Sequence, residues 1–201
     1  QCDYNTVSDK LYELAQKLRE VGKRTLFIRF DNTVDVRRYF EGAVLRAPGA
    51  KWVPEAMMTI GALREEEGKY ESAAKVYENL RNLYAESDQA KTALLREAQV
   101  RLSVLREHEY NRQRCNDTID YLNLAFETCR ESDRESILAC LTEAKSLFEN
   151  EAYLGAKFYD SATRTKRSAI SAYERFLEDY PQSVHADEIR ARVAELKGAA
   201  K

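Results

Sequence analysis

The sequence predicts an all-α protein in which antiparallel helix pairs stack into a superhelix. Only seven Gly and three Pro interrupt its 201 residues, and 33% of the side chains are charged. This composition favours long helices over strands and turns. Apolar residues recur three and four positions apart over most of the chain, which is the period of an amphipathic helix. A helix–turn–helix pattern also returns along the sequence, as it does in repeat proteins.

The clearest repeat unit runs from Pro54 to Ser87. It contains two stretches with helical periodicity around a short polar break that ends at Gly68. Pro54 suits the first turn of a helix, and Gly68 can adopt the left-handed conformation that ends one. The positions that share a face are Met57, Ile60, Gly61 and Leu63 in the first stretch and Ala73, Tyr77 and Leu80 in the second. Two helices, one tight turn and 34 residues match the tetratricopeptide unit in length and in pattern.

The ending of this unit returns near the C-terminus, over Arg167–Ser183. When Tyr173 is aligned with Tyr77, Ala169 falls on Ala73. We expect both alanines to be buried where helices approach closely, and both tyrosines to fill the space between helices. A bulkier residue at either alanine should overpack the core at a cost of ~1–3 kcal/mol.

The whole chain, residues 1–201, is expected to form a single tetratricopeptide-like domain. Its predicted parts are a partial repeat at about 36–53, a repeat at 54–87, a repeat at 88–132 with an inserted loop over 108–116, a repeat at 133–183 with a long first helix, and a C-terminal capping helix at 184–201. The long helix should begin with a capping box formed by Ser132 and Glu135. The segment Thr25–Thr33 has strand-like character. We expect an extended loop there, with a short strand as the alternative.

No constellation of catalytic or metal-binding residues is recognisable, and we expect neither enzymatic activity nor a cofactor or metal. The two histidines, His108 and His185, have no carboxylate or Cys at a ligand spacing and are expected at polar helix ends. Phosphate-binding loops, nucleophile elbows and HExxH patterns are absent from the sequence. The 32 basic and 34 acidic side chains nearly balance, whereas nucleic-acid binders usually carry a basic excess. Proteins are therefore the expected partners, rather than nucleic acids or small-molecule substrates.

The cysteines and one basic run have an ordinary interpretation and a sharper alternative. Cys115, Cys129 and Cys140 are expected to be buried or half-buried apolar residues. A disulfide between Cys129 and Cys140, across the turn at Glu131–Asp133, is the alternative. The run Arg164–Arg167, which reads RTKR, is expected to be a solvated turn between helices. A contact between this run and an acidic partner is the alternative.

Three segments carry a likeness to a known family. They read GKYESAAKVYENL (Gly68–Leu80), AKFYDSA (Ala156–Ala162) and AISAYERFLEDYPQSVHADE (Ala169–Glu188). Together with a loop-interrupted middle repeat before one long helix, they resemble the BamD (YfiO) family of outer-membrane protein assembly lipoproteins. The resemblance implies a periplasmic scaffold of the β-barrel assembly machinery that binds partner subunits and unfolded outer-membrane protein segments. It also implies a place at the periplasmic face of the outer membrane, with membrane contact only through a lipid anchor that is not evident in these residues. A general tetratricopeptide adaptor in envelope maintenance, secretion or signalling is the alternative.

A superhelix of helix pairs has a concave face that holds peptides or whole domains, and the first helix of each pair lines that face. The residues predicted to line this concave groove are Met58, Glu65, Thr92, Arg96 and Gln99. Arg96 and Gln99 lie three positions apart and project from the same side of a helix. An arginine there can fork onto a carboxylate, including a chain terminus. The alternative is that Arg96 pairs with Glu97 or Glu65 and only holds the superhelix together.

Overall fold

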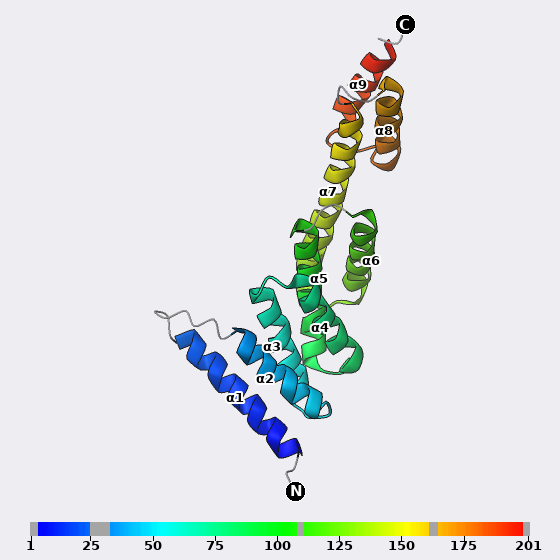
Figure 1. The fold of residues 1–201 in the computed structure, drawn as a ribbon. Coiled ribbons are helices and arrows are strands. Elements are labelled where there is room, and N and C mark those ends of the chain that lie inside the picture. The colour runs from blue at the N-terminus through cyan, green and yellow to red at the C-terminus, as the bar shows by residue number, and fades with distance from the viewer. Residues whose placement is uncertain (1–3, 25–32, 108–110, 161–164, 199–201) are drawn as a thin grey trace.

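The computed structural model describes residues 4–24, 33–107, 111–160 and 165–198. Within these ranges it contains nine α-helices, one short 3-10 helix and no strand. The helices are α1 (Tyr4–Arg24), α2 (Thr33–Arg46), α3 (Val53–Glu66), α4 (Tyr70–Leu83), α5 (Asp88–Glu107), α6 (Arg112–Thr128), η1 (Glu131–Asp133), α7 (Arg134–Tyr159), α8 (Lys166–Asp179) and α9 (Ala186–Gly198). Figure 1 shows them stacked into an elongated solenoid with the chain termini at opposite ends. The predicted fold class is confirmed.

The turn between α3 and α4 forms as its sequence predicts. Pro54 lies in the first turn of α3, where its missing N–H costs no hydrogen bond. Gly68 has φ of 70°, the left-handed conformation that glycine adopts without strain. The amides of Gly68 and Lys69 then bond to the carbonyls of Glu65 and Arg64, at 2.9 and 2.8 Å. These bonds satisfy the last carbonyls of α3 and turn the chain back into α4.

Three apolar clusters follow one another along the solenoid. The first lies among α1, α2, α3, α4 and part of α5, and it buries Phe40, Tyr77 and Leu80 completely. The second joins α5, α6 and the first half of α7 around Leu122 and Ile137. The third joins the second half of α7 to α8 and α9. α5 and α7 each belong to two clusters, so these two helices connect the core along its length.

The residues predicted to hold the helix pairs together are buried. Ala73 and Ala169 are 0% and 1% exposed, and Tyr77 and Tyr173 are 0% and 4% exposed. The alignment of the C-terminal ending with the repeat at 54–87 is therefore confirmed at these four positions.

A buried carboxylate lies where the first and second clusters meet. Glu97 of α5 is 0% exposed and accepts hydrogen bonds from Arg81 at 2.9 Å and from Arg101 at 2.8 Å. Both guanidinium groups also lie over the ring of Tyr121, at 5.4 and 4.4 Å from its centroid. Glu97 thus joins α4, α5 and α6, and it pairs with these arginines rather than with Arg96.

A second polar cluster fastens α9 to the end of α7. Arg192 donates to both carboxylate oxygens of Asp160, at 2.7 and 3.0 Å, and the Tyr173 hydroxyl donates to the same carboxylate at 3.1 Å. The hydrogen bonds from Arg192 lower the pKa of Asp160. Burial raises the pKa of Tyr173 to about 12. His185, at the start of α9, stacks on Tyr153 with ring centroids 3.8 Å apart.

Three local predictions are wrong. Lys166 and Arg167, expected in a solvated turn, are exposed but belong to α8. Residues 112–116 are helical rather than part of an inserted loop, because Asn111 caps α6 by accepting the Arg114 amide at 3.0 Å. Ser132 and Glu135 form no capping box. Residues 131–133 make a 3-10 turn, and the Asp133 carboxylate is taken by Arg130 at 2.9 Å instead of capping α7.

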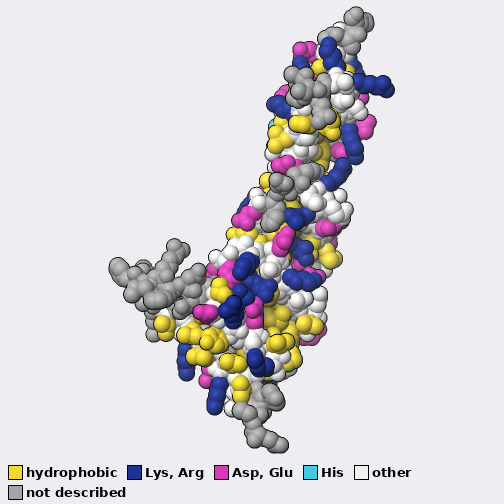
Figure 2. Space-filling model, viewed as in Figure 1, with side chains coloured by type: hydrophobic (Ala, Val, Ile, Leu, Met, Phe, Trp, Pro, Cys, Tyr) yellow, Lys and Arg dark blue, Asp and Glu magenta, His cyan; other side chains and the backbone are white. Residues whose placement is uncertain are grey.

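The expectations for the cysteines can be compared with the structure, whereas those for two other parts of the chain cannot. Cys115 and Cys140 are buried and Cys129 is half-buried, as expected, and all three are free thiols, so the alternative disulfide does not form. The strand-like segment at 25–32 and His108 lie outside the described residues. Figure 2 shows acidic and basic side chains interspersed over the visible face, with hydrophobic side chains gathered near the N-terminal helices.

Candidate functional site

The residues predicted to line the concave groove lie on α3 and α5, which are in contact. Arg96 Nε is 4.0 Å from a carboxylate oxygen of Glu65, and Arg96 Nη1 is 3.4 Å from the amide oxygen of Gln99. The structure therefore brings these three side chains together. Met58 instead packs against the first apolar cluster. The hydroxyl of Thr92 donates to the Asp88 carbonyl at 3.2 Å.

Glu65 contacts Tyr77 in addition to Arg96. The buried hydroxyl of Tyr77 donates a hydrogen bond to its carboxylate. Burial and this carboxylate raise the pKa of Tyr77 well above its usual value. Glu65 thus links α3 to α4 and approaches Arg96 of α5, as the alternative interpretation of Arg96 requires. Arg96 is still 45% exposed, and its role in binding stays a prediction.

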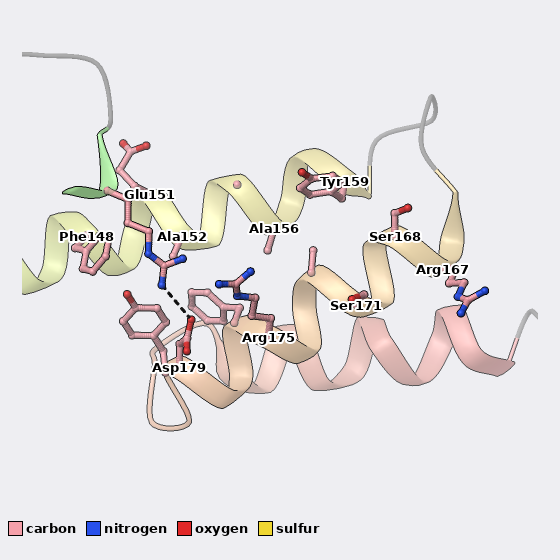
Figure 3. Close-up of a pocket in the computed structure, with 15 residues that line it drawn as sticks. Phe148, Glu151, Ala152, Ala156, Tyr159, Arg167, Ser168, Ser171, Arg175 and Asp179 are labelled. Atoms are coloured by element: carbon pink, nitrogen blue, oxygen red, sulfur yellow. Dashed lines mark ion pairs between the residues drawn. The ribbon is translucent and has the colours of Figure 1, made fainter. Parts of the chain in front are cut away.

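A groove that these residues do not line lies between α7 and α8. This groove of about 720 Å³ runs along these two antiparallel helices, and Arg112 at the start of α6 closes one end. Figure 3 shows α7 along one side of the groove and α8 along the other. We call this the α7–α8 groove.

The floor of the α7–α8 groove is made of small side chains. They are Ala152, Gly155 and Ala156 from α7 and Ser168, Ser171 and Ala172 from α8. Each set follows a spacing of three and four residues, so each forms one stripe along its helix. A Cβ atom placed on Gly155 would have no heavy atom within 4 Å. The floor therefore leaves room for a backbone or side chain from outside to approach both helices closely.

The groove exists because α7 is long. It has 26 residues, whereas α3, α4 and α8 have 14 each, so α7 extends about 18 Å further at 1.5 Å per residue. Its first half packs on α5 and α6, and its second half packs on α8 and α9. Figure 1 shows α6 and α8 one after the other along the length of α7. The pair formed by α8 and the second half of α7 is thus displaced from the preceding helix pair.

One continuous face of α7 is buried in its first half and open in its second. Ile137, Leu141 and Ala144 face the second apolar cluster and are at most 6% exposed. At 3.6 residues per turn the same face continues through Phe148, Glu151 and Gly155, all of which line the groove. Tyr159 also lines the groove and is 43% exposed, and its ring contacts that of Phe158, which is 57% exposed. The face of α7 that α5 and α6 cover in the first half of the helix is therefore not covered by them in the second half.

The charges around the groove are only partly neutralised. Arg112 forms an ion pair with Asp179 at 3.9 Å, which Figure 3 marks with a dashed line. Arg167 and Arg175 of α8 line the groove eight residues apart. Among the described residues, neither of these arginines has a hydrogen bond or ion pair, and neither does Glu151 on the opposite helix.

Sequence reasoning did not identify the α7–α8 groove, although it anticipated the long helix. The signal was the excess length of α7, combined with Ala152, Gly155 and Ala156 at positions where the first half of the helix carries larger residues. Within the described residues, no three His, Cys, Asp or Glu side chains gather as metal ligands do. The same ranges contain no helix with the length and apolar character needed to cross a bilayer.

Comparison with protein families finds a tetratricopeptide repeat at residues 55–87 and again at 153–183. The first match covers most of α3 and all of α4. The second begins at Tyr153, within α7, and continues through α8, so the second half of α7 serves as the first helix of the last repeat. Comparison with curated proteins finds no match. Neither comparison separates the outer-membrane assembly family from other proteins with this repeat. Tetratricopeptide repeats generally serve as scaffolds for protein–protein interaction rather than as enzymes, and this chain contains two segments that match the repeat.

Proposed function

We propose that this protein is a scaffold that holds a partner protein in the α7–α8 groove. The observation that supports this most strongly is the face of α7, buried by α5 and α6 over its first half and open over its second. Exposed apolar side chains that adjoin a groove are characteristic of protein interaction sites. Aromatic residues and arginines, both present on this rim, are enriched at such interfaces.

A more specific role is part of the proposal: the scaffold works at the periplasmic face of the outer membrane, in the machinery that assembles β-barrel proteins. This role rests on the likeness of three segments, 68–80, 156–162 and 169–188, to the BamD family. Its partners would be barrel-assembly subunits and unfolded outer-membrane protein segments. The predicted concave groove around Arg96 would hold an extended segment, and the α7–α8 groove would give the scaffold a second surface, as an adaptor requires.

The test blocks the groove without disturbing the fold. In Gly155→Trp the new side chain enters open space, because no heavy atom lies within 4 Å of its Cβ position. Ala139→Trp is the matched control, since Ala139 is an exposed position on the first half of the same helix. The wild-type chain and both variants are used as bait in solubilised bacterial envelopes, with captured proteins identified by mass spectrometry and melting curves recorded for each bait.

We expect the wild type and Ala139→Trp to capture the same partner, and Gly155→Trp to lose it while melting at an unchanged temperature. Recovery of a β-barrel assembly subunit supports the specific role. Recovery of another envelope or signalling protein, lost in the same variant, favours the general adaptor. Equal capture by all three baits would mean that the α7–α8 groove is not the binding surface.

A further inference from the structure

We propose that the occupant of the α7–α8 groove is an acidic, amphipathic α-helix of the partner protein, held by Arg167 and Arg175. This inference rests on the proposed function and adds the shape and charge of the bound segment. It follows from the packing of α7, from the small residues on the groove floor and from the pattern of charges on the groove rim.

The shape follows from what covers α7 elsewhere. The face of α7 that lines the groove is the continuation of the face that packs on two helices, α5 and α6, in its first half. In the repeat at 55–87 both sides of the helix pair are covered, by α2 and by α5. The last repeat has α9 on one side, and on its other side the groove stands where the preceding helices would pack. A helix is therefore the shape that restores the packing of the repeat.

The floor of the groove suits a helix for a second reason. Helices approach one another closely where small residues recur at a spacing of three and four, because a ridge of one helix then enters a groove of the other. Ala152, Gly155 and Ala156 on α7 and Ser168 and Ala172 on α8 recur at this spacing along the groove, so a bound helix can approach both helices closely. The exposed side chains of Tyr159, which lines the groove, and of Phe158, whose ring contacts Tyr159, would cover apolar residues of the bound helix.

The charge follows from the groups on the rim that lack a partner. Arg112 and Asp179 pair with each other. This leaves Arg167 and Arg175 on the α8 side and Glu151 on the α7 side without an ion pair in the described part of the chain. Eight residues of helix separate the two arginines by about 12 Å along α8. A bound helix matches this distance with carboxylates seven or eight residues apart, and a basic residue on its other edge would face Glu151.

The probe is a designed peptide, an Ala-based helix of about 20 residues, long enough to be helical in water. It carries a Leu stripe on one face and two Glu residues eight positions apart at the edge of that stripe. A second peptide has Lys at those two positions, and a third has the Glu residues but a central Pro that breaks the helix. Binding to the full chain is measured by isothermal titration at low salt.

Charge reversal of the chain supplies the matched comparison. Arg167→Glu/Arg175→Glu changes the rim of the groove, and Lys10→Glu/Arg38→Glu makes the same change of net charge at exposed positions on α1 and α2. We expect the acidic helix to bind the wild type and the control variant equally, and the groove variant about tenfold more weakly, as two lost ion pairs of this kind imply. The Lys peptide should prefer the groove variant over the wild type.

The inference is overturned if the acidic helix binds the groove variant as tightly as the wild type, or if the Pro-containing peptide binds as well as the intact helix. Absence of binding by the acidic helix up to about 1 mM also overturns it. If Gly155→Trp abolishes partner capture while these peptide results fail, the scaffold function stands and the helical, acidic occupant is wrong.

Discussion

The two segments that match the tetratricopeptide repeat differ in how their neighbours cover them. α3 and α4 lie between α2 and α5, and Tyr77 and Leu80 between them are fully buried. α8 and the second half of α7 are covered by α9 on one side and carry a groove on the other. The repeat at 55–87 is thus enclosed by its neighbours, whereas the repeat at 153–183 has a groove on one side. The length of the first helix makes this difference, because it moves most of the last pair away from α5 and α6, and α6 contributes only Arg112 to one end of the groove.

The first way to test this comparison is to disturb the join between the enclosed repeat and the next helix pair. Glu97→Ala leaves Arg81 and Arg101 without their buried carboxylate. Removing one partner of a buried ion pair costs about 3 kcal/mol or more. Chemical denaturation of the full chain should show this loss.

Glu143→Ala is the control for Glu97→Ala, because Glu143 pairs with Arg106 while 43% exposed. We expect it to cost less than about 1 kcal/mol, since exposed ion pairs contribute little. Equal losses in the two variants would mean that Glu97 does not hold the enclosed repeat to its neighbour.

The second prediction concerns a glycine inside the enclosed repeat. A Cβ atom on Gly61 would overlap the ring of Tyr77, which is buried and hydrogen-bonded to Glu65 and so cannot move aside freely. We expect Gly61→Ala to destabilise the chain by about 1–2 kcal/mol, because overpacking outweighs the gain in helix propensity. A melting temperature equal to that of the wild type would contradict this packing.

The third prediction concerns the covered side of the last repeat, where Asp160 ties α7 to Arg192 of α9. Hydrogen bonds from Arg192 lower the pKa of Asp160 in the folded chain, so this stabilisation is present above the unfolded pKa of about 3.9 and is lost as pH falls through the folded value. Asp160→Asn should lower the melting temperature by about 2 °C at neutral pH. The difference from wild type should shrink steadily below about pH 4. A difference that is constant with pH would show that the carboxylate charge is not involved.

The smallest expected effect has the opposite sign and lies in the open groove. Gly155→Ala adds a methyl group where nothing lies within 4 Å, and Ala is a better helix former by about 0.5–1 kcal/mol. We expect a slight rise in the melting temperature. Gly155→Ala and Gly61→Ala are the same substitution, made once in the open repeat and once in the enclosed repeat, so their effects on stability can be compared directly. A loss of stability at Gly155 would mean that the groove is filled by the chain itself.

Much of the fold follows from residues whose role is local or periodic. Ala73, Tyr77, Ala169 and Tyr173 sit at repeat positions that the sequence displays directly, and Gly68 ends α3 because only a left-handed residue fits there. One cap prediction and one loop prediction failed. The capping box of Ser132 and Glu135 does not form, because α7 starts after Asp133, whose carboxylate is held by Arg130. The predicted loop is shorter, because Asn111 starts α6 earlier than the apolar pattern suggests.

The candidate site was harder to predict, because it depends on how helices that are distant in the sequence pack against α7. Ala152, Gly155 and Ala156 give no apolar signal of their own, and α7 reads as one amphipathic helix. Whether other helices cover the second half of α7 depends on where α6 begins and on the direction in which α8 packs back along α7. The sequence of α7 alone carries no information on either. Arg167 was noticed in the sequence as part of a basic run, and the structure adds Arg175 to the same side of the groove.

The measurement that tests the central claim most directly is site-specific photo-crosslinking in living cells. A photoreactive phenylalanine analogue replaces Phe158, whose ring contacts the groove-lining Tyr159, or Leu83 on α4 of the enclosed repeat. These side chains are 57% and 70% exposed. We predict that Phe158 crosslinks to one discrete protein, through a segment that mass spectrometry maps to an acidic helix, and that Leu83 gives no such product. Crosslinking to the same protein from Leu83 but not from Phe158 would contradict the claim that the open repeat is the binding surface.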